Sequence, residues 1–184
     1  MTKEEQSKST GALGLLQVYT GPGKGKTTAA VGLAVRAAAQ GLKVAFIQFA
    51  KPGSSAECNS LEELGVDCMQ FGAEGWVKDS EAGDNKEHLA EALKGWKHSL
   101  IYLKGEEIVD LLILDEINII ISAGIIDTPK VMKALLNRPH GLEVVCTGRG
   151  APPELVMAAD LVTEMLEIKH YFQQGAEARR GIEY

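Results

Sequence analysis

Several features that would place a protein in a specialised class are missing from this chain of 184 residues. Proline is scarce at six residues, the 20 glycines follow no period, and no segment repeats at the spacing of about 20 to 50 residues that marks a solenoid. Low-complexity tracts are also absent. These absences favour an ordinary globular protein, and a chain with 45% hydrophobic residues is long enough for one domain with a substantial core.

Positive charge is not in excess, because 19 Lys and Arg stand against 25 Asp and Glu, for a net charge of −6 and a pI near 5.3. A surface for nucleic acid usually needs a surplus of Lys and Arg to neutralise phosphates. The sequence therefore predicts no nucleic-acid partner, and any anion must be held by a local group of residues.

The chain has no C-x-x-C pair and an odd number of cysteines, Cys58, Cys68 and Cys146. This pattern fits a reducing compartment better than a disulfide scaffold. We expect the three cysteines to be buried thiols, which is the usual preference of this residue.

Long apolar runs are absent as well. Residues 1–12 mix Lys, Glu, Ser and Thr without the apolar stretch of a secretory signal, and the run Leu111 to Leu114 is far shorter than the roughly 20 residues that span a bilayer. We expect a soluble, cytoplasmic protein with no membrane partner, in which a polar segment, residues 1–13, precedes a single domain over residues 14–184.

What the chain does contain is an alternation of strand and helix patterns. Strands are predicted at residues 15–19, 43–49, 66–71, 108–114 and 142–147, and helices at 27–40, 60–64, 89–103 and 128–136. Asp84 and Glu87 form a capping box ahead of the third helix, and Thr128 with Pro129 opens the fourth. This alternation predicts an α/β fold with a mostly parallel sheet flanked by helices, whose ligands bind beyond the carboxyl ends of the strands.

A glycine-rich loop follows the first predicted strand and opens the first predicted helix. Its residues are Gly21, Pro22, Gly23, Lys24, Gly25, Lys26, Thr27 and Thr28, and they match G-x-x-x-x-G-K-[ST] except that Thr20 stands at the first position. Glycines with positive φ would turn backbone N–H groups inward, where they and the helix N-terminus cradle a polyphosphate. A plain turn with solvated lysines is the alternative, but the strand and helix on either side favour an ATP site. Together with the alternating elements, the loop predicts a RecA-like P-loop nucleotide-binding fold.

Side chains around this loop suggest how the phosphates and a metal would be held. Lys26 supplies a full positive charge, Thr27 can ligate Mg²⁺, and Thr28 can donate to a phosphate oxygen. Asp115 and Glu116 end a strongly apolar strand, where carboxylates commonly hold Mg²⁺, or Mn²⁺ in its place, directly or through water. A solvated strand end is the alternative for this pair.

Two arginines are candidates to reach the phosphates. Arg149 follows the last aliphatic strand, and Arg36 lies on the helix behind the loop, where an ordinary surface position is equally consistent with the sequence. By contrast, no metal-binding or nucleophile motif includes His88, His98, His140 or His170. No protein nucleophile is therefore indicated.

The succession of motifs resembles the corrinoid adenosyltransferases of the P-loop type, over residues 14–184. The resemblance is carried by the loop Thr20 to Ala30, Arg36, Gln48-Phe49 with Lys51, Glu57, Asn59, Leu61-Glu62, Leu114-Asp115-Glu116, Asn137-Arg138-Pro139, Thr147-Gly148-Arg149-Gly150, Lys169-His170, Phe172, Gly175, Ala178 and Gly181-Ile182-Glu183-Tyr184.

This resemblance implies an enzyme that transfers the 5′-deoxyadenosyl group of ATP to the Co(I) of a reduced corrinoid and releases intact triphosphate, in the biosynthesis or salvage of adenosylcobalamin. Lys26, Thr27, Glu116 and Trp76 would act in catalysis, and ATP would lie in the loop in the reverse of its usual orientation. A homodimer and a reductase that supplies Co(I) are implied as partners.

Three features differ from the family pattern or bear on closure of the site. In similar proteins an aromatic pair helps to displace the lower ligand of the corrinoid, and Trp76 matches one member whereas Glu74 stands in place of the other. The leading segment is shorter than the helix that covers the partner's site in some relatives. The segment from His170 to Tyr184 is expected to close over the site.

Two other functions remain open on the residues alone. One is a RecA-like ATPase or small-molecule kinase, and the other is a carrier or sensor that binds ATP and corrinoid without chemistry. The sequence does not distinguish complete cobalamin from cobyrinic acid a,c-diamide or cobinamide as substrate.

Overall fold

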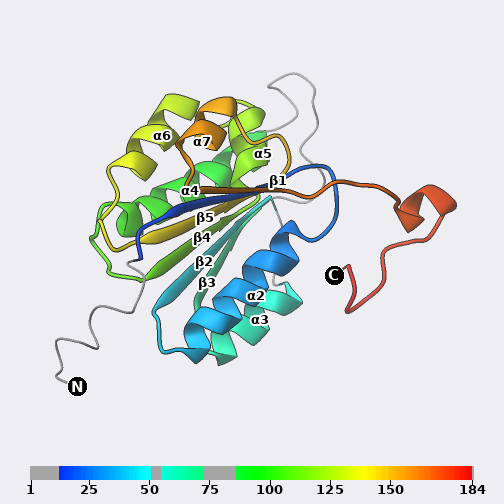
Figure 1. Ribbon diagram of the computed structural model, residues 1–184, viewed down its shortest axis with the longest axis horizontal. Coiled ribbons are helices and arrows are strands. Elements are labelled where there is room, and N and C mark those ends of the chain that lie inside the picture. The colour runs from blue at the N-terminus through cyan, green and yellow to red at the C-terminus, as the bar shows by residue number, and fades with distance from the viewer. Residues whose placement is uncertain (1–12, 51–54, 73–85, 184) are drawn as a thin grey trace.

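The computed structural model describes residues 13–50, 55–72 and 86–183, and these residues form one six-stranded sheet with helices on both sides (Figure 1). The strands are β1 (Leu16–Thr20), β2 (Val44–Phe49), β3 (Asp67–Phe71), β4 (Leu111–Asp115), β5 (Glu143–Thr147) and β6 (Leu161–Glu164). Their order across the sheet is β3-β2-β4-β5-β1-β6, and every neighbouring pair is parallel. The predicted parallel sheet is confirmed, and it is all parallel rather than mostly so.

Helices cover the two faces of the sheet as separate layers (Figure 1). One layer contains α2 (Lys26–Ala39) and α3 (Ala56–Glu63), and the other contains α4 (Lys86–Leu103), α5 (Ile117–Ser122), α6 (Thr128–Leu136) and α7 (Pro153–Ala158). A buried cluster lies under each layer, because alternate residues of each strand point to opposite faces. Within β4, for example, Leu112 and Leu114 pack under the second layer and Ile113 packs under the first.

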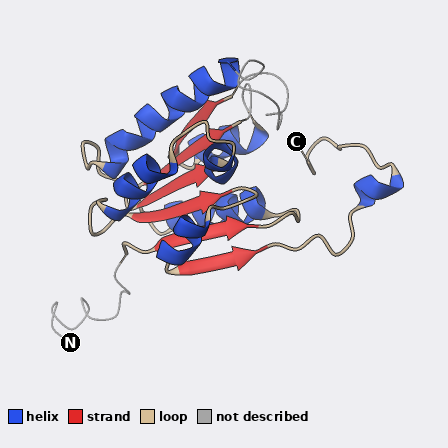
Figure 2. Ribbon diagram, turned by 90° about the horizontal axis from the view of Figure 1, so that it is seen from above, coloured by secondary structure: helices blue, strands red, loops and turns tan. Residues whose placement is uncertain are grey.

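The carboxyl ends of all six strands meet at one edge of the sheet (Figure 2), as a parallel arrangement requires. The loop that follows β1 and the carboxylates that end β4 therefore share one edge, with only β5 between their strands. This arrangement brings together side chains that are about ninety residues apart, such as Thr27 and Asp115 with a separation of 88.

Some element boundaries differ from those predicted. Strand β4 begins at Leu111 rather than Ile108, whose side chain is 79% exposed, because Asp110 bonds to the backbone of Lys43 just ahead of the strand. Helix α3 begins at Ala56 instead of residue 60, since the Ser55 side chain caps it by accepting from the Cys58 N–H.

Helix α6 ends at Leu136 as predicted, but its N-cap is Asp127 rather than Thr128, which is the first helical residue. The sequence patterns missed α5, α7, β6 and the 3₁₀ helix η1 (Tyr171–Gln174), each of them six residues or shorter. Such elements are too short to show a period. Asp84 of the expected capping box lies outside the described residues, while Glu87 lies in the first turn of α4.

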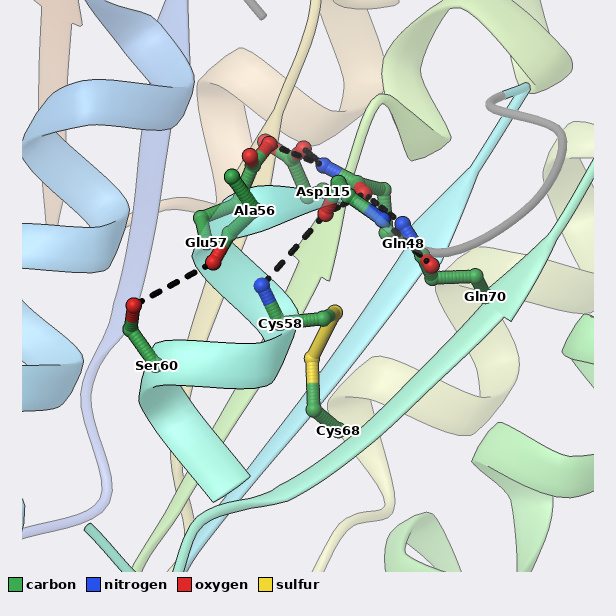
Figure 3. The surroundings of a disulfide bond; sticks show 9 residues. Gln48, Ala56, Glu57, Cys58, Ser60, Cys68, Gln70 and Asp115 are labelled. Atoms are coloured by element: carbon green, nitrogen blue, oxygen red, sulfur yellow. Dashed lines mark hydrogen bonds between the residues drawn. A yellow bond between two sulfur atoms is a disulfide. The ribbon is translucent and has the colours of Figure 1, made fainter. Parts of the chain in front are cut away.

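Cys58 and Cys68 form a disulfide bond between α3 and β3 (Figure 3), so the prediction of three buried thiols is wrong for this pair. The chain reverses direction between the two elements, through Gly65 at φ 78°, and this turn brings the two Cα atoms to 5.6 Å. The sequence spacing gave no sign of that reversal. Only Cys146 is a free, buried cysteine, and burial raises the pKa of its thiol to about 12.

We predict that reducing this disulfide lowers the free energy of unfolding by about 3 kcal/mol, because the unfolded chain gains the freedom of a loop closed over ten residues. Urea unfolding with and without a thiol reductant measures the change. A Cys58→Ala/Cys68→Ala variant should show no dependence on the reductant, and an unchanged midpoint in the wild-type protein would contradict the prediction.

No helix among the residues described here combines the length and apolar composition needed to cross a membrane.

Candidate nucleotide- and metal-binding site

The glycine-rich loop lies between the end of β1 at Thr20 and the start of α2 at Lys26, as the motif required. Gly25 is the N-cap of α2, and no side chain caps the first turn of this helix. That turn also contains no acidic residue. The N-terminal end of a 14-residue helix, with roughly half a positive charge, therefore faces the loop without a competing carboxylate on its own first turn.

Two different structural reasons explain why glycine stands at three positions of the loop. Gly21 and Gly25 adopt the positive φ angles expected, 96° and 118°. Gly23 does not, and our expectation for it was wrong. A Cβ atom at Gly23 would lie only 2.7 Å from the carbonyl oxygens of Met165 and Leu166, so close approach by the segment after β6 requires a glycine here. The Gly23 N–H donates to the Met165 carbonyl at 2.7 Å.

Thr20, which replaces the usual first glycine, links the loop to its surroundings. Its hydroxyl accepts the Ala151 N–H at 3.2 Å, and its carbonyl accepts the Met165 N–H at 2.9 Å. The loop is thus attached to the segment after β5 on one side and to the segment after β6 on the other. A glycine at this position would keep only the backbone bond.

Lys26 points into the loop and is buried at 7% exposure. Its ammonium donates to the carbonyl oxygens of Gly21 at 2.9 Å and Gly23 at 2.8 Å, which leaves one of its three protons for a further acceptor. Burial lowers the pKa of Lys26, and the nearby charge of Glu116 opposes that shift. A buried ammonium with one proton to donate is a strong site for a phosphate oxygen.

Asp115 is fully buried and accepts hydrogen bonds on both carboxylate oxygens. Thr147 donates to Oδ1 at 2.6 Å, Gln48 donates to Oδ2 at 2.8 Å, and Thr27 donates to Oδ1 at 2.9 Å. Because the Thr27 proton is directed to Asp115, the lone pairs of its hydroxyl face away from the carboxylate. This geometry suits Thr27 to bind a cation while Asp115 orients it.

Glu116 follows directly and adopts a left-handed backbone conformation with φ 63°, as the N-cap of α5. Its N–H donates to the Thr147 hydroxyl at 3.0 Å. Gly148 lies against its carboxylate, and a Cβ there would come within 3.1 Å of Glu116 Oε2. The charge of Glu116 also acts against the lowering of the Lys26 pKa.

The described residues contain no group of three or more His, Cys, Asp or Glu side chains arranged to hold a metal ion. A dedicated cage is not what Mg²⁺ needs, because this ion keeps several waters and binds through one or two protein oxygens together with substrate phosphates. The oxygens of Thr27, Asp115 and Glu116 are of the right chemical type for it.

The two arginine candidates differ in position. Arg149 is exposed in the segment directly after β5, which bonds to the start of the loop through the Ala151 N–H and the Thr20 hydroxyl, and its charge lowers the pKa of Lys26. Arg36 is exposed in the last turn of α2, ten residues after Lys26 and thus about 15 Å further along the helix axis. The structure therefore brings Arg149 to the loop and leaves Arg36 away from it. Pro22 and Thr28 are exposed on the loop and the first turn of α2.

Lys24 is held by the C-terminal part of the chain. Its ammonium contacts Glu183 Oε1 at 3.1 Å, the Ile182 carbonyl at 3.0 Å and the Tyr171 hydroxyl at 3.3 Å. After β6 the chain runs out from the body and then returns toward the loop (Figures 1 and 2). Glu183 also bonds to Arg179 and Tyr171, and the Arg179 bond is the largest cause that holds the Glu183 pKa below its usual range.

We predict that Glu183→Gln releases this returning segment, because it removes the charge that Lys24 and Arg179 share. Backbone amides of residues 176–183 should then exchange with deuterium about three to ten times faster. Glu177→Gln, an exposed glutamate on the same segment, is the matched control and should leave exchange unchanged. Equal exchange in all three proteins would show that the Lys24–Glu183 contact does not hold the segment.

Two residues at the site were not singled out with a role from the sequence. Gln48 and Thr147 are polar, fully buried and placed near the carboxyl ends of β2 and β5. A buried polar residue at the end of an apolar strand is the signal that could have found them. Trp76, Glu74 and Lys51 lie outside the described residues.

The fold and the site together define a P-loop nucleotide-binding α/β protein. Its architecture is that of a RecA-like domain: a solved RadB recombinase aligns with a TM-score of 0.50 at 18% identity, covering 86% of this chain and 77% of that chain. The likeness concerns the fold alone.

Sequence comparisons then give the family. The family model described as ATP:corrinoid adenosyltransferase BtuR/CobO/CobP matches residues 12–184. The corrinoid adenosyltransferase of Escherichia coli K12 is 37% identical over 172 residues, 93% of this chain and 86% of that protein, and that of Pseudomonas aeruginosa is 36% identical over 176 residues, 93% and 84%. The corrinoid adenosyltransferase CobA of Salmonella typhimurium is 35% identical over 172 residues, 93% and 86%. The chain belongs to the ATP:corrinoid adenosyltransferase family, a family of transferase enzymes.

Proposed function

We propose that this protein transfers the 5′-deoxyadenosyl group of ATP to the Co(I) of a reduced corrinoid and releases intact triphosphate. The observation that carries this proposal is the grouping of buried Lys26 and Asp115 with half-buried Thr27 at the loop, in a chain that matches the family over nearly its whole length. Such a loop holds a polyphosphate, and in this reaction the polyphosphate is the leaving group.

In the proposed reaction, a Co–C bond forms as cobalt donates its electron pair to the 5′-carbon of ATP, and the bond from that carbon to the triphosphate oxygen breaks. The substrate brings its own nucleophile, so no side chain has to be deprotonated to attack. The protein has to align the reacting atoms and stabilise the charge that develops on the departing oxygen. Lys26, the uncapped N–H groups of α2 and Arg149 serve the second task.

Mg²⁺, or Mn²⁺ in its place, would neutralise part of the triphosphate charge. Thr27 would supply a hydroxyl ligand, Asp115 would orient that hydroxyl, and Glu116 would bind the ion directly or through water. The loop residues from Gly21 to Thr28 would surround the phosphates, with Lys24 able to exchange its contact with Glu183 for a phosphate oxygen.

Other predicted roles also remain proposals. Trp76 would pack against the corrinoid and help to displace its lower ligand, and residues 14–184 would act as one domain. Arg36, on the far end of α2, would reach a ligand only if that ligand extended along the helix. We also propose that the protein works as a homodimer, with Co(I) supplied by a separate reductase.

A cytoplasmic location is proposed because ATP is the substrate. There the Cys58–Cys68 bond would exchange with the thiol pool, since disulfides in the cytosol are commonly transient. Trapping thiols with a maleimide during cell lysis would give the fraction of the protein that carries the bond.

Anaerobic incubation with ATP and a chemically reduced corrinoid tests the proposed function. The spectrum of an adenosyl-corrinoid should develop, and its rate with cobalamin, cobinamide and cobyrinic acid a,c-diamide would identify the preferred substrate. Turnover of ATP to ADP without any corrinoid would favour an ATPase or kinase instead. Binding of both substrates without product would favour a carrier or sensor.

A further inference from the structure

The hydroxyl of Thr147 lies between the two carboxylate residues of the candidate metal site. Thr147 is the last residue of β5, and the register pairs Leu114 with Cys146, so the next residues, Asp115 and Thr147, end neighbouring strands side by side. The Thr147 hydroxyl donates to Asp115 Oδ1 at 2.6 Å and accepts the Glu116 N–H at 3.0 Å. One hydroxyl therefore contacts the side chain of Asp115 and the backbone of Glu116.

The directions of these two hydrogen bonds are fixed by chemistry. A backbone N–H can only donate, so the Thr147 oxygen must accept from Glu116. The single proton of the hydroxyl is then available for Asp115, which is its other neighbour. Thr147 is fully buried, so water does not compete for either bond.

The bond to Glu116 holds an unusual backbone conformation. Glu116 has φ 63°, in the left-handed region that side-chain-bearing residues seldom adopt, and this conformation turns the chain from β4 into α5. Gly148, directly after Thr147, leaves room for the Glu116 carboxylate, because a Cβ there would approach Oε2 to 3.1 Å. The end of β5 thus shapes the position of the Glu116 carboxylate as well as that of Asp115.

Gln48 holds the other oxygen of Asp115 from β2 (Figure 3). Its amide nitrogen donates to Asp115 Oδ2 at 2.8 Å, while its amide oxygen accepts from Gln70 at 2.6 Å and from Ser55 at 3.2 Å. The Gln48 amide nitrogen faces an acceptor and the amide oxygen faces two donors, so only one orientation of this amide satisfies the hydrogen bonds. Asp115 is therefore held on both sides, and its remaining neighbour is the Thr27 hydroxyl.

We propose that Thr147 is a positioning residue for the metal site, which acts by holding Asp115 and Glu116 so that the lone pairs of Thr27 and the carboxylate of Glu116 face one Mg²⁺. Gln48 supports it by holding Asp115 Oδ2. This inference rests on the proposed function in one respect, which is that Mg²⁺ binds together with ATP. It requires no corrinoid, so it can be tested without adenosyl transfer.

Thr147→Val tests this role, because valine has nearly the shape of threonine but neither donates nor accepts a hydrogen bond. Mg²⁺ is titrated into protein with a fluorescent N-methylanthraniloyl derivative of ATP and no corrinoid, and the Mg²⁺ concentration at half-maximal binding is measured. In Thr147→Val this concentration should rise about 10- to 100-fold, as is typical when residues that orient metal ligands are lost. At saturating Mg²⁺ the affinity for the nucleotide should return to within about threefold of wild type.

Two matched variants separate positioning from a general structural role. Thr147→Ser retains the hydroxyl and should restore the wild-type Mg²⁺ dependence to within about threefold. Val145→Ala removes buried methyl groups from the same strand without touching the carboxylates, so it should lower stability but not alter the Mg²⁺ dependence. The Glu116 amide should exchange faster with deuterium in Thr147→Val and not in Val145→Ala.

The proposal is overturned if Thr147→Val keeps the wild-type Mg²⁺ dependence, or if Val145→Ala shifts it equally. Wild-type nucleotide binding that ignores Mg²⁺ would overturn it too. If Thr147→Val does not fold, Gln48→Leu is the deciding variant. It removes the donor to Asp115 Oδ2, together with the acceptor for Gln70 and Ser55, and should shift the Mg²⁺ dependence in the same direction. A normal Mg²⁺ titration without any adenosyl product would refute the proposed function and leave this inference standing.

Discussion

Replacing Lys26 with alanine should lower kcat/KM for ATP by about 10³-fold while the protein remains folded. The ammonium of Lys26 lies inside the loop, where it already bonds to the Gly21 and Gly23 carbonyls and retains one proton for a phosphate oxygen. In a buried site, a charge aimed at a developing anion contributes far more than it would in water. The variant loses this charge at the point where the leaving group gains its own.

The fold should survive this change because two effects of the truncation on stability offset each other. A solvated loop lysine would have contributed little to stability, but Lys26 is buried and burial lowers its pKa. Truncation to alanine removes the hydrogen bonds of Lys26 to the loop, which lowers stability. It also removes the cost of burying the ammonium, which raises stability.

The initial rate of adenosyl-corrinoid formation at varied ATP concentration measures kcat/KM, and circular dichroism measures folding. Lys104→Ala, on an exposed lysine paired with Glu106, is the control and should behave as wild type. Near-wild-type kcat/KM in Lys26→Ala would refute the assigned role of this lysine.

The second large effect is expected for Asp115→Asn. This substitution should weaken Mg²⁺-dependent ATP binding by about 10²-fold and lower the free energy of unfolding by about 1 to 3 kcal/mol. The carboxylate accepts from Thr147, Gln48 and Thr27, all of which donate. In asparagine an amide NH₂ group replaces one carboxylate oxygen, so a donor would face the donors of these neighbours. At least one buried partner would then lose its hydrogen bond.

Asp110→Asn is the matched control, because Asp110 lies just before the other end of the same strand and its carboxylate accepts the Lys43 N–H at 2.7 Å. It should alter stability slightly and leave the Mg²⁺ dependence unchanged. Mg²⁺ titrations of nucleotide binding and urea unfolding of both variants provide the comparison. Equal effects of the two substitutions would show that Asp115 has only a structural role.

The sequence predicted the parts of the site that are local in the chain. The loop from Gly21 to Thr28 could be recognised because its glycines, Lys26 and flanking strand and helix are consecutive, and Asp115 because an apolar strand ends at it. The physical reason for Gly23 could not be found in this way, since it depends on the approach of Met165 and Leu166 from the far end of the chain.

Long-range contacts account for what the sequence missed. Gln48 and Thr147 bond to Asp115 across 67 and 32 residues, and no local pattern reports which polar residue will face which carboxylate. The disulfide was missed because the turn between α3 and β3, rather than the spacing of its cysteines, brings Cys58 to Cys68. Likewise, the contact of Lys24 with Glu183 spans 159 residues.

The fate of the 5′-carbon of ATP tests the central claim most directly. ATP labelled with ¹³C at that carbon is incubated anaerobically with the protein and a reduced corrinoid, and the products are separated and examined by ¹³C and ³¹P NMR. We predict that the label becomes bonded to cobalt and that one intact triphosphate appears for each labelled corrinoid. Label that remains on ADP, with free phosphate and an unlabelled corrinoid, would contradict the account.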